Sequence, residues 1–238
     1  MRAFILVGGL GTRLKSLTNG LPKPMITVAG KPFLEHLVEK LRSEDVRDLV
    51  MCVGYGAQAI EDYFGDGSKW GVTIRYARES KLLGTAGAIK NAEPYAVKEN
   101  LVLNGDSYFD INYHQMLQAH RTRNALITIA CTQAHETGDY GNILIDQDYR
   151  IKGFREKVAA SEKGLISGGV YLFDRAVFDS IPKGQKASLE EEIFPKMVTQ
   201  GKCFAFPSEG YFIDIGTPER LAKAQKEFQL LLGSKSYD

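Results

Sequence analysis

The chain has 238 residues, and its 30 Lys and Arg residues nearly balance its 29 Asp and Glu residues, leaving a formal net charge of +1. Such a balance gives no extended positive field, which argues against a nucleic acid polymer or an anionic membrane as a partner. We expect no membrane span and no signal peptide, because no apolar stretch of the sequence is long enough. The three cysteines lie far apart in apolar, strand-like segments, which predicts buried thiols and a cytoplasmic location.

In the first half of the chain, segments with strand character alternate with segments of helical periodicity. This alternation predicts right-handed crossovers and a Rossmann-like α/β fold, with a mixed, mostly parallel sheet flanked by helices. The predicted strands are 2–7, 48–53, 72–77 and 100–103, and the predicted helices are 32–42, 58–64 and 85–92.

Past Asp106 strands dominate, and we expect this part to form a mixed sheet laid over the carboxyl edge of the first half. Ser188 followed by Glu191 fits a capping box that begins a helix to about residue 200. Thr217 or Pro218 should begin a terminal helix to about residue 232. The absence of repeats and long linkers predicts a single domain, 1–238. The other predicted elements are a helix at 113–121 and strands at 125–131, 142–145, 151–155 and 165–173.

A glycine-rich segment, Gly8-Gly9-Leu10-Gly11-Thr12-Arg13-Leu14, directly follows the first predicted strand. Its glycines allow backbone N–H groups to approach anionic oxygens closely, because no Cβ stands in the way. Arg13 adds a forked donor, and Lys23 in the segment Leu21-Pro22-Lys23-Pro24 adds a second cation. Together these features predict a polyphosphate pocket, and the alternative is a tight turn without a ligand.

The commoner nucleotide motifs do not fit this segment. A dinucleotide fingerprint needs a third glycine where this chain has Leu14, which argues against a hydride-transferring Rossmann enzyme. The Gly-Lys-Pro at residues 30–32 has no glycine at position 25, which argues against P-loop chemistry. A Gly-x-Ser-x-Gly nucleophile elbow is missing too, and the four histidines lack metal-ligand spacing, so we expect them to be surface or packing residues.

These segments resemble the signature of the sugar-1-phosphate nucleotidyltransferase family, Gly-Gly-x-Gly-Thr-Arg-Leu followed by Pro-Lys-Pro-Met. The resemblance implies the nucleotide-diphospho-sugar transferase fold, with a nucleotide-binding half at 1–110 and a sugar-binding half at 111–238. The further matching blocks, in family order along the chain, are Gly30-Lys31-Pro32, Leu83-Gly84-Thr85-Ala86-Gly87, Asn104-Gly105-Asp106, Glu156-Lys157 and Asp214-Ile215-Gly216-Thr217-Pro218.

The resemblance assigns the nucleotide to the first half of the chain. It implies two catalytic residues: Arg13, which would hold the β- and γ-phosphates, and Lys23, which would neutralise charge at the α-phosphoryl group. The implied nucleotide-binding residues are Leu6, Gly8, Gly9, Gly11, Thr12, Arg13, Gly84, Thr85 and Gly105.

Two aspartates are candidates for binding a metal. Asp106 follows the predicted strand 100–103, at the edge where open α/β sheets bind ligands, and its alternative is a turn-forming role. Asp214 has apolar neighbours, so its burial needs a compensating cation or hydrogen-bond donors. Its alternative is to cap the terminal helix, for which Thr217 is better placed. The resemblance implies that Asp106 and Asp214 hold Mg²⁺, which takes one or two carboxylates plus phosphate oxygens.

The implied contacts with the sugar phosphate come from the second half. The resemblance assigns Glu156 to sugar hydroxyls, Lys157 to the sugar phosphate and the backbone of Gly141 to the hexose. The alternative for Glu156 and Lys157 is a solvated strand end, and Val158 stands where relatives commonly have proline. Ser167 takes the place of a family asparagine and is the fourth candidate for a contact with the sugar.

The implied reaction is attack by a sugar 1-phosphate oxygen on the α-phosphorus of a nucleoside triphosphate, with release of pyrophosphate. The segment Leu83 to Gly87 resembles guanylyltransferases more than thymidylyl members, which favours GTP. Lys90-Asn91-Ala92 and the short chain are similar to bacterial D-glycero-α-D-manno-heptose 1-phosphate guanylyltransferases. The alternatives are a mannose 1-phosphate guanylyltransferase, an N-acetylmuramate 1-phosphate uridylyltransferase and a catalytically silent nucleotide-sugar sensor. The oligomeric state stays open, a homo-oligomer included.

Overall fold

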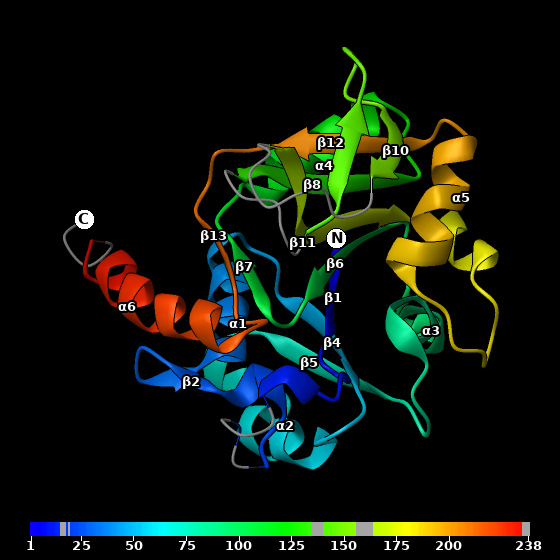
Figure 1. Cartoon of the computed structure of the whole chain (residues 1–238). Helices are drawn as coiled ribbons and strands as arrows, with labels where there is room; N and C mark the ends of the chain where they lie inside the picture. Colours follow the sequence, from blue (N-terminus) through cyan, green and yellow to red (C-terminus); the bar gives the residue numbers. More distant parts are fainter. Residues whose placement is uncertain (15–17, 19, 135–139, 156–163, 235–238) are drawn as a thin grey trace.

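The computed structural model describes residues 1–14, 18, 20–134, 140–155 and 164–234. Its centre is a nine-stranded mixed sheet. Figure 1 shows helices lying against this sheet. The predicted α/β fold is confirmed by this arrangement.

The first-half strands form the parallel part of the sheet, in the order β6-β1-β4-β5. Their side chains are mostly apolar and buried, as expected for parallel strands covered on both faces. Each predicted element of this half begins and ends within one residue of its prediction. The strands are β1 Arg2–Leu6, β4 Asp48–Val53, β5 Thr73–Arg78 and β6 Glu99–Asn104, the helices are α1 Phe33–Ser43, α2 Ala57–Phe64 and α3 Gly84–Asn91, and a small hairpin joins β2 Thr27–Val28 to β3 Lys31–Pro32.

The strands of the second half extend this same sheet, so the prediction that they lie over the carboxyl edge of the first half is wrong. The long strand β11 (Gly164–Asp174) pairs antiparallel with β6 on one side and with β8 (Ile127–Ala134) on the other. Without β11, the outer edge of β6 would leave N–H and C=O groups unpaired. The remaining strands of the sheet are β9 Asn142–Ile145, β10 Ile151–Arg155 and β12 Cys203–Pro207.

A bend divides β11 into two parts. Its register with β8 shifts between Ser167 and Tyr171. Gly169 within the bend has φ +70°, a left-handed conformation that favours glycine. A Cβ on Gly168 would lie 2.2 Å from the ring of Phe109, so this position also has no room for a side chain. The local structure therefore explains why both positions are glycine. The bend also places Ser167 Oγ 3.4 Å from the Tyr171 hydroxyl.

A second, two-stranded sheet joins distant parts of the chain. Strand β7 (Ser107–Phe109) pairs antiparallel with β13 (Phe212–Asp214), and the two run side by side in Figure 1. Asp214 lies opposite Ser107, and the N–H of Ile215 donates to the carbonyl of Asp106 at 2.9 Å. This pairing, which the sequence pattern does not predict, brings the backbones of the two candidate metal ligands together.

The predicted helix after Ser188 consists of two parts. A π-helical turn, Leu189–Ile193, runs into α5 (Phe194–Thr199). Ser188 Oγ accepts from the N–H of Glu191 at 3.1 Å, but the side chain that accepts from the Ser188 N–H, at 2.8 Å, is that of Glu192. The wide first turn therefore moves the reciprocal capping partner by one residue. The other helices of this half are α4 Tyr113–Thr122 and α6 Pro218–Ser234.

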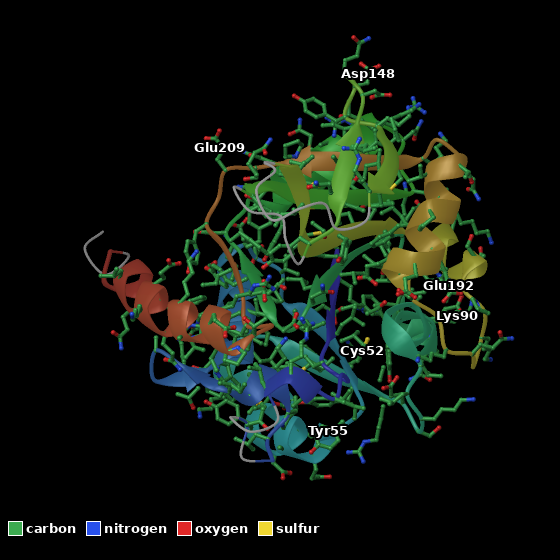
Figure 2. The ribbon with its side chains drawn as sticks, viewed as in Figure 1. Cys52, Tyr55, Lys90, Asp148, Glu192 and Glu209 are labelled. Atoms are coloured by element: carbon green, nitrogen blue, oxygen red, sulfur yellow. The ribbon has the colours of Figure 1, made fainter. Side chains whose placement is uncertain are left out.

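The cysteines are buried and carry free thiols, as predicted. Burial raises the pKa of the Cys52 and Cys203 thiols to about 12, because it disfavours the thiolate. Figure 2 shows Cys52 in the interior, whereas Asp148 and Glu209 lie at the outer edge. In the part of the chain that the structure describes, no helix is both long and apolar enough to cross a membrane.

Two histidines are packing residues, as predicted. His36 is buried and its Nε2 bonds to the carbonyl of Val28 at 2.8 Å, while His120 is buried with its Nδ1 2.8 Å from the Thr128 hydroxyl. Burial lowers the pKa of both imidazoles, because it disfavours the charged form. Both rings therefore favour the neutral form.

Candidate functional site

A cavity of about 490 Å³ opens where β1 and β6 end. Open α/β sheets bind ligands at this carboxyl edge, and the volume lies within the roughly 300–1,000 Å³ of small-molecule sites. The lining residues are Leu6, Val7, Gly8, Gly9, Leu10, Gly11, Arg13, Leu14, Lys23, Pro24, Glu79, Leu82, Gly84, Thr85, Ala88, Asn104, Asp106, Lys186 and Gly216.

The glycine-rich segment forms one wall of the cavity. After β1 it passes through Gly8, Gly9 and Gly11 into a 3-10 turn at Thr12–Leu14. Gly11 has φ +58°, and a Cβ on it would lie only 3.0 Å from the Cβ of Lys23. The glycine thus lets the two cation-bearing segments pack against each other.

Lys23 points across the cavity wall to a carboxylate. It begins a short 3-10 turn, Lys23–Met25, and its Nζ lies 2.5 Å from Asp106 Oδ2. The Lys23 side chain is 12% exposed and that of Asp106 is 37% exposed. Arg13 is exposed and also lines the cavity. Two cations and one partly solvated carboxylate therefore line the same cavity.

Asp214 lies behind this wall and is almost fully buried. Its carboxylate accepts from the N–H of Gly216 at 2.6 Å and from the Tyr140 hydroxyl, and both its oxygens lie 3.3 Å from an Arg220 nitrogen. Thr217, rather than Asp214, caps α6, because its Oγ1 accepts from the N–H of Arg220 at 3.3 Å. The capping alternative for Asp214 is therefore wrong.

The two aspartates provide oxygen ligands of the kind that a hard cation prefers. Asp214 ends β13, and Asp106 directly precedes the partner strand β7. Each carboxylate is paired with a side-chain cation. Among the described residues no cluster of three or more His, Cys, Asp and Glu could hold a metal. Two carboxylates together with phosphate oxygens are a donor set that a hard divalent cation can accept, so the chemistry of Asp106 and Asp214 is compatible with such an ion.

Glu79, a carboxylate in the cavity wall, was not predicted from the sequence. Glu79 directly follows β5, and its Oε2 accepts from the N–H of Leu83 at 3.1 Å. Partial burial raises the pKa of this carboxyl above its usual value. The signal that could have revealed it is an acidic residue at the end of a predicted strand, just before the block Leu83 to Gly87.

Lys186 was also missed, because it belongs to the second half of the chain. The N–H groups of Ala86 and Gly87 donate to the carbonyl of Ala187, at 3.0 and 3.3 Å. These bonds hold the segment around Ala187 against the start of α3, so that Lys186 lines the cavity. No local motif marks this lysine.

Asn104 is the last residue of β6, and its side chain has an unsatisfied hydrogen-bond acceptor among the described residues. Its Oδ1 is buried and has no hydrogen-bond partner among the described residues, while its Nδ2 lies 3.5 Å from the Tyr171 hydroxyl. An unpaired buried acceptor is costly, and a ligand hydroxyl in the adjoining cavity could satisfy it. The motif block Asn104-Gly105-Asp106 contains this residue, but the family resemblance assigns it no role.

The structure gathers most, not all, of the predicted site residues. Leu6, Gly8, Gly9, Gly11, Arg13, Lys23, Gly84, Thr85 and Asp106 line one cavity. Gly105 is buried beneath it, and its N–H donates to the Leu6 carbonyl at 2.9 Å. Gly141, Ser167 and Asp214 are described but do not belong to the lining. Glu156 and Lys157 lie outside the described residues, as does the side chain of Thr12.

Comparison with known proteins gives near full-length matches. Residues 2–229 match the family described as nucleotidyl transferase. A D-glycero-α-D-manno-heptose 1-phosphate guanylyltransferase of Aneurinibacillus thermoaerophilus is 40% identical, over 96% of this chain and 99% of its own length. A mannose-1-phosphate guanylyltransferase of Mycobacterium tuberculosis is 34% identical, over 94% of this chain and 64% of its own length. The crystal structure of HddC from Yersinia pseudotuberculosis complexed with GMP-PN superimposes with a TM-score of 0.84, at 33% identity, over 95% of this chain and 99% of that one.

Proposed function

Because this chain belongs to the nucleotidyl transferase family, we propose that it transfers GMP from GTP to a sugar 1-phosphate and releases pyrophosphate. The proposed acceptor is D-glycero-α-D-manno-heptose 1-phosphate, and the product is the corresponding GDP-heptose. The main support is the 40% identity, over 96% of this chain, to a protein with that activity. The three buried free thiols suit a reducing cytoplasm, where we place the reaction.

In the proposed reaction the attacking phosphate is already ionised near neutral pH, so no strong general base is needed. Catalysis then rests on alignment and on stabilisation of charge. Arg13 would hold the β- and γ-phosphates against the glycine-rich wall, where Gly8, Gly9 and Gly11 leave backbone groups accessible. Lys23 would leave Asp106 and turn to the α-phosphoryl group, where negative charge develops.

Asp106 and Asp214 would hold a divalent cation, and we propose Mg²⁺. When bound, this ion would neutralise phosphate charge and bring the two substrates into line. The carboxylates would contribute their charge and their fixed position: Asp106 from the cavity wall and Asp214 from the neighbouring strand.

Glu79 and Lys186 would select guanine. Guanine offers N1–H and N2–H₂ donors beside its O6 acceptor, and a carboxylate is a pure acceptor whereas an ammonium group is a pure donor. Glu79 and Lys186 line the same cavity, next to Gly84 and Thr85. The raised pKa of Glu79 reflects partial burial, and guanine would supply the missing donors.

The sugar would lie toward the second half, 111–238, beyond the end of β6. The unpaired Oδ1 of Asn104 can accept from a sugar hydroxyl, and Ser167 is joined to it through Tyr171. Gly141 is exposed and directly precedes β9. We retain Gly141, Glu156, Lys157 and Ser167 as proposed contacts with the sugar phosphate.

A grid of nucleotides against sugar 1-phosphates, read by pyrophosphate release from the purified protein, tests the proposal. We expect the highest kcat/KM for GTP with the heptose 1-phosphate. The kcat/KM for UTP should be lower by roughly 10- to 100-fold, because a mismatched base leaves buried polar groups without hydrogen-bond partners. The decrease in kcat/KM with mannose 1-phosphate should be smaller than that with UTP. Mannose lacks one hydroxylated carbon of the heptose, so fewer polar groups lose their hydrogen-bond partners. A higher value for UTP or for mannose 1-phosphate would overturn the matching half of the assignment, and no pyrophosphate release would favour a silent sensor.

Glu79→Gln should lower kcat/KM for GTP by roughly tenfold and narrow the preference for GTP over UTP. The reason is that an amide presents a donor as well as an acceptor, which suits uracil as well as guanine. In the wild type, kcat/KM for GTP should fall as the pH is lowered through the raised pKa of Glu79, because protonation turns the acceptor into a donor.

In the Glu79→Gln variant, this decrease of kcat/KM for GTP at low pH (the acid limb of the pH profile) should be absent. Glu61→Gln is a matched control, because Glu61 pairs with Arg78 outside the cavity lining. Unchanged base selectivity in Glu79→Gln, with the acid limb intact, would contradict the role of Glu79.

A further inference from the structure

Arg220 occupies a position in α6 that does not suit a cation. It lies in the first turn of the helix, and its N–H is bonded to the capping Thr217. The N-terminal end of a helix carries partial positive charge, so an arginine there is unfavourable unless an anion compensates it. An anion close by would therefore stabilise the arginine at this position.

This anion is Asp214. Arg220 Nη1 lies 3.3 Å from each of the two carboxylate oxygens, and its guanidinium stacks over the ring of Tyr140, with 4.3 Å to the ring centroid. Tyr140 donates its hydroxyl to the same carboxylate. The Asp214 side chain is 8% exposed, so an unpaired negative charge there would be costly. Arg220 supplies the compensating charge.

The ion pair lies directly behind the cavity wall. Gly216 lines the cavity, and a Cβ on it would be 2.6 Å from Asp214 Oδ1 and 3.4 Å from Arg220 Nη1. The second ion pair joins Lys23 to Asp106. Asp106 directly precedes β7, the strand that pairs with β13. Among the described residues, Asp106 is thus paired with Lys23 at 2.5 Å and Asp214 with Arg220 at 3.3 Å.

We propose that Arg220 is a positioning residue that keeps Asp214 neutralised until a divalent cation takes its place. This inference rests on the proposed function, since it assumes that Asp106 and Asp214 are the metal ligands. One dication would replace the two monocations that pair with Asp106 and Asp214, so the net charge at the two carboxylates is preserved. Arg220 would then compete with the metal, and the substrate-free protein would bind divalent cations weakly.

Removal of the Arg220 side chain should therefore increase the affinity for divalent cations, even in the absence of substrate. An opposite charge shifts a carboxylate's affinity for a proton by roughly 10- to 1,000-fold, and we expect a change of at least about tenfold for Mn²⁺. Arg220→Gln should bind Mn²⁺ that much more tightly than the wild type, whereas Arg220→Lys, which keeps the charge, should stay close to it. The measurement is free Mn²⁺ from its EPR signal, in titrations of the full chain without nucleotide.

Two controls separate the outcomes. Arg175→Gln removes an arginine that pairs with Glu93 outside the cavity lining, and it should leave Mn²⁺ affinity unchanged. Asp106→Asn should weaken binding if the metal site is correct. No response to Asp106→Asn would refute the metal site of the proposed function. A response to Asp106→Asn without tightening in Arg220→Gln would refute only the role of Arg220.

A second measurement does not depend on the folding of Arg220→Gln. In the wild type, Mg²⁺ should shift the Nε–H NMR signal of Arg220, which is assigned by its loss in Arg220→Lys. If the Nε–H signal of Arg220 does not shift at saturating Mg²⁺, the proposed replacement of Arg220 by a divalent cation is wrong. A purely structural role for Arg220 predicts a lower melting temperature in Arg220→Gln with no gain in Mn²⁺ affinity.

Discussion

Lys23→Ala is expected to lower kcat by roughly 10²–10³-fold, or about 3–4 kcal/mol, and to change the KM for GTP much less. Lys23 should act on charge that develops at the transferring phosphoryl group, so its loss affects the transition state more than the ground state. Steady-state kinetics of pyrophosphate release measure both constants.

The geometry makes this variant a clean test. Its partner Asp106 is 37% exposed, so water can solvate the carboxylate that Lys23→Ala leaves behind. We expect a loss of stability below about 1 kcal/mol, as for other partly exposed pairs. Lys31→Ala is the matched control, because Lys31 pairs with Glu35 and Glu39 outside the cavity lining and should keep full turnover. Full turnover in folded Lys23→Ala would eliminate the proposed role.

Asp106→Asn and Asp214→Asn should each abolish most of the Mg²⁺-dependent activity. An amide keeps the shape of the side chain but removes the charge that holds the cation. Because both residues would serve one metal, the double variant should be little worse than either single variant. Turnover as a function of Mg²⁺ concentration gives the comparison.

The two variants should differ in stability, which separates metal binding from structure. Asp106 is partly exposed, and its replacement should change the unfolding free energy by less than about 1 kcal/mol. Asp214 is buried with Arg220 and Tyr140, and Asp214→Asn should cost about 1–3 kcal/mol, because it leaves the guanidinium without its anion. Thermal unfolding of both variants tests this difference. An Asp214→Asn enzyme that stays active but unfolds more easily would show that Asp214 is a structural residue only.

The order of the elements was predictable because its signals are local. Each strand on the parallel part of the sheet shows a short apolar run, and each helix between them shows apolar residues at helical spacing. The second half was harder. Its strands were recognised, but the prediction that they lie over the carboxyl edge of the first half was wrong. The edge of β6 pairs with β11 through backbone hydrogen bonds, which any sequence can make.

The glycine-rich wall of the candidate site was also predictable. Gly8, Gly9, Gly11 and Arg13 lie close together in the sequence, so the loop that they form depends on local chemistry. The family membership predicted from these residues is confirmed. Glu79 and Lys186 escaped detection because an isolated charged residue carries no motif.

By itself, the sequence determined the parallel half of the sheet and the glycine-rich wall with its two cations, because neighbouring residues decide strand, helix and turn. Only the tertiary structure decided which groups face each other across the site. The pairing of β7 with β13 brings Asp106 beside Asp214, and the start of α6 brings Arg220 to that carboxylate. Three-residue strands are too short to show a periodic pattern, and contacts between residues so far apart in the chain depend on the packing of the whole molecule.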